Sequence, residues 1–328
     1  MNNQEYAPII IPTLNRYEHL KRLVVSLMQC EEAKYTELVI GLDYPPNKSF
    51  VDGYNKVKEY LPTIDVFRKV TILAADVNLG FDKNYERLRS YVWEHGYDSF
   101  IFSEDDNLFA PSFLSYLNWG LKTFKDDPSI LAICSYREND EPIRDYPNNF
   151  YKAAGVRPYG FGIWKDRWER LEERTDYETM KAFVDRMPML SVFKMEKVRV
   201  ACKYLYLYSH KIVHGDFCMG QMCTDEDMFC ITPIKSLAKT LGTEGSGLHG
   251  ANLDIYKKEF ARVLDNSATF VPIWIEEDLY TPAVVNAENL IAKELTKYSL
   301  KQFFRYCFYI LKFLVYKTTG RIISYKQN

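Results

Sequence analysis

The chain of 328 residues has no excess of basic residues, because 42 Lys and Arg stand against 44 Asp and Glu, for a formal net charge of −2. Domains that bind nucleic acids are usually basic, so this balance argues against a nucleic-acid partner. No apolar stretch reaches the roughly 20 uncharged residues that a membrane-spanning helix needs. The polar start from Met1 to Tyr6 leads directly into an apolar run, which predicts no secretory signal peptide.

Cysteine pairs with metal-binding or redox spacing are also missing. None of the seven cysteines belongs to a Cys-x-x-Cys pair, and Cys218, Cys223 and Cys230 have no partner at zinc-finger spacing. Seven is an odd number, and unpaired thiols are typical of a reducing compartment. The sequence therefore predicts a cytoplasmic protein with free cysteines.

The first 135 residues alternate between short apolar runs and amphipathic stretches. The apolar runs predict strands at residues 7–12, 37–43, 69–73, 99–103 and 130–135. Apolar residues with helical spacing predict helices between them, at residues 20–27, 51–61, 82–94 and 112–124. This alternation indicates an α/β fold with a mostly parallel sheet and helices on both of its faces.

The rest of the chain is less regular. It predicts helices at residues 165–173 and 195–208, a strand at 229–233 and a Gly-rich loop at 242–250. It contains no internal repeat and no low-complexity linker. We expect one large domain over residues 1–292, followed by a tail of different composition at residues 293–328.

Polar residues follow three of the predicted strands, at residues 13–16, at Asp43 and at Glu104, Asp105 and Asp106. In open α/β sheets, ligands bind beyond the carboxyl ends of the strands. Three adjacent carboxylates repel one another, and a hard cation such as Mg²⁺ or Mn²⁺ would relieve that repulsion. The alternatives are an acidic turn that caps the following helix and, for Asp43, a simple turn residue.

The segment from Ser103 to Tyr116 resembles the metal-binding segment of the GT-A N-acetylglucosaminyltransferase I family. In both, a Glu-Asp-Asp triplet follows a strand and precedes Ala-Pro, an aromatic residue and a helix. The resemblance implies that Asp106 holds Mn²⁺ or Mg²⁺ and that Glu104 and Asp105 hold the nucleotide sugar.

The opening segment from Ile9 to Arg16 also resembles this family, and the bacterial family 2 glycosyltransferases, at their first strand and nucleotide loop. The position of Asp43 matches the acidic residue that contacts uracil in the former family. The resemblance implies donor contacts from the residues of this loop and from the second strand, namely Pro12, Thr13, Asn15, Arg16 and Asp43.

Two later segments extend the resemblance. The stretch from Gly160 to Trp168 is similar to a Gly-Leu-Gly-Trp stretch, whose glycines Gly160 and Gly162 would let the backbone approach the donor. A tight packing turn explains the glycines equally well. The block from 215 to 250 is similar to a Trp-Asp-Tyr-Gln segment that precedes a strand, a Gly-rich loop and a His.

This last block implies that Asp216 is the catalytic base and that His249 reaches the metal or the diphosphate. It departs from the family because Gly215 replaces the Trp, and about 40 preceding residues have no counterpart. The rival bases are the acidic residues that follow, Asp225, Glu226 and Asp227, which could also start a solvated helix. A lone His is more often structural than a ligand.

The resemblance, over about residues 7–250, implies a metal-dependent inverting glycosyltransferase with a hexosyl or N-acetylhexosaminyl donor, which family likeness alone makes UDP-linked. The acceptor would be a glycan or lipid-linked glycan in surface polysaccharide synthesis. It divides the predicted domain into a nucleotide-binding half at residues 1–135 and an acceptor half at 136–292. The alternatives are a non-catalytic carbohydrate-binding or host-interaction protein and a sugar-nucleotide pyrophosphorylase, which normally carries a basic Gly-rich loop after its first strand.

The C-terminal tail is basic and apolar at once. From Leu295 to Asn328 it contains seven basic residues and no acidic ones. Arg305 and Lys312 interrupt its apolar stretch, which is therefore too short and too charged to span a bilayer. The pattern predicts an interfacial helix on the inner face of the cell membrane. The alternative is a helix that packs on the catalytic domain with its cations in solvent.

Overall fold

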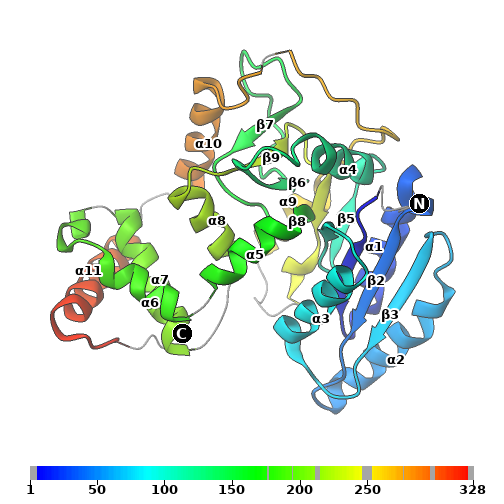
Figure 1. Cartoon of the computed structure of the whole chain (residues 1–328), viewed down its shortest axis with the longest axis horizontal. Coiled ribbons are helices and arrows are strands. Elements are labelled where there is room, and N and C mark those ends of the chain that lie inside the picture. Colours follow the sequence, from blue (N-terminus) through cyan, green and yellow to red (C-terminus); the bar gives the residue numbers. More distant parts are fainter. Residues whose placement is uncertain are drawn as a thin grey trace. The chain divides into compact units, whose positions relative to one another are not determined.

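The computed structural model describes residues 6–175, 177–193, 195–210, 215–245, 253–275, 277–295 and 300–323. The chain forms two compact units, each made of two segments (Figure 1). The first unit contains Met1–Trp168 and Gly220–Glu288, and the second contains Glu169–Met219 and Asn289–Asn328. Helices α5 (Lys165–Arg174), α8 (Gly215–Asp225) and α10 (Pro282–Leu295) contain residues of both units.

The first unit is built on a sheet of eight strands in the order β3-β2-β1-β4-β8-β6-β9-β7. The strands are β1 (Ile9–Thr13), β2 (Glu37–Leu42), β3 (Lys69–Ala74), β4 (Ser99–Phe102), β6 (Ile130–Cys134), β7 (Phe150–Ala153), β8 (Phe161–Trp164) and β9 (Phe229–Pro233). β1 pairs in parallel with β2 and β4, β2 with β3, and β6 with β9. β8 runs antiparallel between β4 and β6, and β7 runs antiparallel to β9. The predicted α/β fold is confirmed.

Helices cover both faces of this sheet (Figure 1). They are α1 (Tyr17–Met28), α2 (Val51–Tyr60), α3 (Gly80–Glu94) and α4 (Phe113–Thr123). The apolar stripe of α1 packs with Ile9 and Ile11 of β1 in the core. On the other face, a β-carbon at Gly41 would come within 3.0 Å of Leu88 on α3. Alternate residues of each buried strand thus face different helices.

A small second sheet joins distant parts of the chain. β5 (Asn107–Phe109) directly follows the acidic triplet and pairs antiparallel with β10 (Ala238–Thr240). The sequence analysis predicted neither strand, nor β7 and β8, because runs of three or four residues show no clear periodicity. Helices α6 (Tyr177–Arg186), α8, α9 (Leu253–Ala261) and α10 were also missing from the prediction.

The second unit is helical in its described residues. It contains α6, α7 (Met195–His210) and α11 (Leu300–Thr319), together with the short 3-10 helix η4 (Met189–Phe193). α11 contacts α7 and η4, and its side chains Phe313 and Tyr316 are buried. The segment predicted as a separate tail therefore forms one unit with residues 169–219. Within the described parts of the chain, none of the helices is both long and apolar enough to cross a bilayer.

A buried carboxylate stabilises the start of β2. Glu37 accepts hydrogen bonds from Tyr97 at 2.7 Å and from Tyr91 and Thr71 at 2.8 Å, and it pairs with Lys69 at 3.0 Å. Burial disfavours the ionised carboxylate, but these hydrogen bonds outweigh it and lower the pKa of Glu37 to about 2. Because the pKa is lowered on folding, this stabilisation is present above the ordinary pKa and is lost as the pH falls toward 2.

We expect Glu37→Gln to lower the free energy of unfolding at pH 7, by an amount on the order of 3 kcal/mol. The difference from the wild type should shrink as the pH falls from about 4.5 to about 2, where the native carboxylate also becomes protonated. Urea unfolding across this range measures it. Glu94→Gln at an exposed helix position is the matched control. A Glu37→Gln effect that does not change with pH would contradict this role.

Candidate active site

The loops after β1 and β4 meet at the carboxyl edge of the sheet, because these strands are parallel neighbours. The Thr13 hydroxyl donates a hydrogen bond to Asp105 Oδ2 at 2.8 Å. Arg16 donates one guanidinium N–H to Asp106 Oδ2 at 2.7 Å and another to Asp105 Oδ1. The structure thus brings together four of the predicted site residues, two from each loop.

Arg16 neutralises the two aspartates that it contacts. Both carboxylates are buried, Asp105 with 3% and Asp106 with 5% of its surface exposed. Burial raises the pKa of Asp105, whereas Arg16 and Thr13 oppose that rise. Burial likewise disfavours the charged guanidinium, but the two carboxylates outweigh it and raise the pKa of Arg16. The sequence analysis assigned the relief of carboxylate repulsion to a metal ion, and this was incomplete, because Arg16 supplies positive charge there.

Asp106 nevertheless has one carboxylate oxygen, Oδ1, that is buried and has no hydrogen-bond partner. Gly242 lies against its other side, where a β-carbon would come within 1.9 Å of Oδ2. The Asp106 carbonyl accepts a hydrogen bond from the Leu241 N–H at 2.9 Å. Pairing of Thr240 with Asn107 in the small sheet brings these residues together. Only glycine leaves room for the Asp106 side chain at position 242.

These residues fit a divalent cation that a ligand helps to bind. Mg²⁺ is usually held by one or two carboxylates, with phosphate oxygens and waters completing its shell. The unpartnered Oδ1 of Asp106 is a suitable oxygen donor. Among the described residues, no three His, Cys, Asp or Glu side chains gather as a metal-binding group. The donor set therefore suits a cation completed by a diphosphate. The predicted ligand His249 lies outside the described residues.

Asp43 directly follows β2 at the same edge of the sheet and has a well-defined structural role. Its carboxylate accepts hydrogen bonds from the backbone N–H groups of Tyr44, Leu79 and Gly80, at 2.8 to 2.9 Å, and from the Asn78 side chain at 3.1 Å. Negative charge at a helix N-terminus is stabilising, and α3 begins at Gly80. A carboxylate has about four acceptor positions. A contact with a nucleobase would require one of these donors to move away.

The remaining residues that were predicted to contact the donor differ in how deeply they are buried. Pro12 is buried within β1. The Asn15 carbonyl oxygen lies close to Gly53 on α2, because a β-carbon on residue 53 would be 2.3 Å from that oxygen. Glu104 is half-buried at the end of β4. These positions close the loop after β1 against α2.

The two glycines that were predicted to approach the donor lie in different structural settings. Gly160 precedes β8 with φ +85°, and a β-carbon there would come within 2.6 Å of the Phe109 ring. Gly162 lies inside β8, where a β-carbon would be 2.9 Å from Leu121 on α4. Packing of strand against helix therefore explains Gly162, and its contact with a donor stays a prediction.

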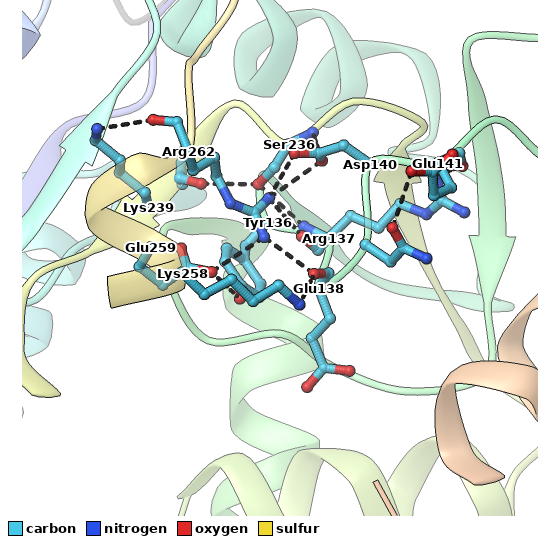
Figure 2. A network of polar contacts seen from close by, with 12 residues as sticks. Tyr136, Arg137, Glu138, Asp140, Glu141, Ser236, Lys239, Lys258, Glu259 and Arg262 are labelled. Carbon is cyan, nitrogen blue, oxygen red and sulfur yellow. Dashed lines mark hydrogen bonds and ion pairs between the residues drawn. The ribbon is translucent and has the colours of Figure 1, made fainter. Parts of the chain in front are cut away.

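A buried ionic network lies beyond the end of β6 (Figure 2). Arg262 donates hydrogen bonds to Glu259 and to both carboxylate oxygens of Asp140, at 3.0 to 3.1 Å, and to two backbone carbonyls. The Tyr136 hydroxyl donates to the same Glu259 oxygen at 3.0 Å. These hydrogen bonds offset part of the cost of burying the charges, while the other Glu259 oxygen, Oε2, is buried without a partner. The network fixes α9 to the loop that follows β6.

Sequence reasoning missed this network and its link to the acidic site. The rings of Tyr136 and Tyr159 meet edge to face, with their centroids 4.7 Å apart. Burial, with the charges of Glu104 and Asp106, raises the pKa of Tyr159 to about 12. The only sequence signal was the spacing of Glu259 and Arg262, three residues apart on one helical face. Tyr159 is thus a neutral hydroxyl beside the acidic site at physiological pH.

The predicted base Asp216 lies in the second unit, in the first turn of α8. The rival Asp225 ends the same helix, in the first unit, and Asp227 follows it with a positive φ of 52°. Asp216 and Asp225 therefore lie at opposite ends of one helix, nine positions apart, and the roles of all these candidates stay predictions.

No protein-family model and no curated protein matches the sequence. The fold is similar to three solved structures at low identity. The mannosyltransferase PcManGT from Pyrobaculum calidifontis, in complex with GDP-Man and Mn²⁺, is 11% identical over 96% of this chain and 88% of its own, with a TM-score of 0.39. TarS from S. aureus is 13% identical over 61% of this chain and 43% of its own, with a TM-score of 0.35. Its 1–349 fragment is 13% identical over 63% and 68%, with a TM-score of 0.34. All three TM-scores are below 0.5, and the function proposed below rests on the site itself.

Proposed function

We propose that this chain is a glycosyltransferase of the GT-A type that uses a nucleoside diphosphate sugar. The observation that carries the proposal is the site at the carboxyl edge of the parallel strands. There Thr13 and Arg16 hold Asp105 and Asp106, and Asp106 Oδ1 is a buried oxygen without a partner. Ligands of open α/β sheets bind at this edge.

In this proposal Asp106 holds Mn²⁺ or Mg²⁺, which when bound would stabilise the negative charge of the diphosphate. Arg16 and Thr13 fix the orientation of the two aspartates. The acceptor hydroxyl attacks the anomeric carbon, its proton passes to Asp216, and the bond from that carbon to the diphosphate oxygen breaks. The nucleoside diphosphate leaves with the bonding electrons, so the anomeric configuration is inverted.

The finer assignments follow from the family resemblance. The donor is a UDP-linked hexose or N-acetylhexosamine, and the acceptor is a glycan or lipid-linked glycan of surface polysaccharide synthesis. Residues 1–292 form the catalytic domain, and residues 1–135 within it bind the nucleotide. The basic C-terminal segment would hold the enzyme at the inner face of the membrane, near a lipid-linked acceptor.

The rival functions make different demands on the same site. A pyrophosphorylase needs a basic loop whose charged side chains are available to bind a nucleoside triphosphate. Here the loop after β1 offers Arg16, whose guanidinium is bound to Asp105 and Asp106. A carbohydrate-binding module has no need for two buried aspartates at the edge of a parallel sheet. Both observations favour the transferase.

We expect one nucleotide sugar, from a panel tested with Mn²⁺, to be hydrolysed slowly without an acceptor, because water replaces the acceptor hydroxyl. Release of the nucleoside diphosphate measures this, and chelation of the metal should abolish it. Formation of a nucleoside triphosphate on adding pyrophosphate would instead identify a pyrophosphorylase. Absence of nucleotide binding throughout the panel would identify a non-catalytic module.

A further inference from the structure

Charge is divided very unevenly between the two compact units. The second unit, Glu169–Met219 with Asn289–Asn328, contains 17 Lys and Arg and only 9 Asp and Glu, a net charge of +8. The whole chain has a net charge of −2, so the first unit carries −10. An anionic surface would therefore attract the second unit and repel the first.

The same basic unit exposes large apolar side chains. On η4, Leu190 is 73% and Phe193 is 82% exposed. On α11, the exposed residues are Phe304, Phe308 and Leu311, at 67%, 45% and 53%. Their spacing of four and three residues places them in one stripe on the helix. Because α11 contacts η4, these five residues belong to neighbouring elements, and we call them the apolar surface.

The apolar surface is distinct from the side of α11 that holds the unit together. Phe313 is fully buried, and Tyr316, which is 4% exposed, donates a hydrogen bond to Asp185 on α6. Lys317 donates to the Asp185 carbonyl at 2.7 Å. α11 therefore has one apolar side that packs and another that remains exposed. Exposed apolar residues gathered in this way mark interaction sites.

We infer that the apolar surface binds an anionic lipid bilayer, with η4 and α11 inserting together at the headgroup level. Bulky apolar residues on a strongly basic element are the combination that binds such a membrane interface. The inference rests on the membrane contact proposed above and deepens it, because it assigns the contact to both segments of the second unit. A second copy of the same unit would bring two charges of +8 together and is disfavoured.

Sedimentation of the full chain with vesicles tests the inference, without nucleotide, so that it does not depend on transferase activity. The wild type should bind phosphatidylcholine vesicles that contain phosphatidylglycerol, and it should bind less as NaCl is added. The double variant Leu190→Ser, Phe193→Ser should lower the partition coefficient by about tenfold or more, since it removes two inserting side chains. Phe304→Ser, Phe308→Ser should act similarly.

The matched control is Val263→Ser, Val271→Ser, which removes two side chains that are 88% and 70% exposed on the acidic first unit. It should bind vesicles as the wild type does. Equal binding by the wild type and the η4 variant would overturn the inference, as would equal binding to pure phosphatidylcholine vesicles. A concentration-dependent dimer that the η4 variant abolishes, without vesicle binding, would assign the surface to a second copy. Donor hydrolysis by the same proteins tests the transferase proposal separately.

Discussion

Asp106→Asn is expected to weaken Mn²⁺-dependent binding of UDP and to lower donor turnover, each by at least about tenfold. The reason is the buried Oδ1 of Asp106, which is the oxygen best placed to bind a hard cation. A neutral amide oxygen binds such a cation more weakly than a carboxylate does. The fold should persist, because the side chain keeps its size beside Gly242 and Arg16 still pairs with Asp105. Calorimetry of UDP with and without Mn²⁺ measures the effect.

The matched control for this substitution is Asp127→Asn. Asp127 precedes β6 at the opposite edge of the sheet, where its carboxylate accepts hydrogen bonds from Ser129. Its loss removes one charge of the same kind without touching the site, so UDP affinity should stay at the wild-type value. If Asp106→Asn and the wild type bind UDP equally in Mn²⁺, the metal assignment must be abandoned.

The parallel half of the sheet could be predicted because its sequence signal is local. β1 and β4 are wholly buried, so every residue is under the same selection for an apolar or small side chain. The helices between them show the spacing of one buried stripe, as in Leu20, Leu23 and Leu27 of α1. Each of these patterns is contained within a single element.

The antiparallel half could not be predicted, because its signals are contacts between distant residues. Gly162 suggested a close approach to the donor or a tight packing turn, whereas it lies within β8, packed against Leu121. β5 and β10 have three residues each, and their pairing joins Asn107 to Thr240. Neither strand has enough residues to show a period of two.

At the site, the sequence identified the acidic residues but not what neutralises them. Arg16 and Asp106 are 90 positions apart, and a metal ion or an arginine would satisfy the same triplet. Tyr136 and Glu259 are 123 positions apart. Only the parallel pairing of β1 with β4 establishes that Arg16 reaches both aspartates.

The C-terminal segment shows how one pattern can fit two interpretations. Its composition predicted an interfacial helix or a helix that packs on the protein. α11 buries Phe313 and exposes Phe308, so its two sides have different environments. For this reason truncation after Ala292 would expose the core of the second unit, and substitutions on the exposed side are the better test of membrane binding.

The catalytic base is expected to give the largest effect of any substitution in this chain. Asp216 lies in the first turn of α8, where an acidic side chain interacts favourably with the helix dipole. Its negative charge also acts on a neighbour, since burial together with Asp216 raises the pKa of Cys218 to about 12. An ionised aspartate that takes the proton of the acceptor hydroxyl suits a base that works at neutral pH.

Asp216→Asn should lower turnover by about 10²–10⁴-fold, the usual contribution of a general base, while donor affinity stays near the wild-type value. Thermal unfolding of the variant separates a catalytic loss from the small cost of removing the first-turn charge, about 0.3–1 kcal/mol. Asp225→Asn and Asp227→Asn, made in parallel, should retain the wild-type turnover. If either of them shows the large loss and Asp216→Asn does not, the base lies at the end of α8 and the role assigned to Asp216 is wrong.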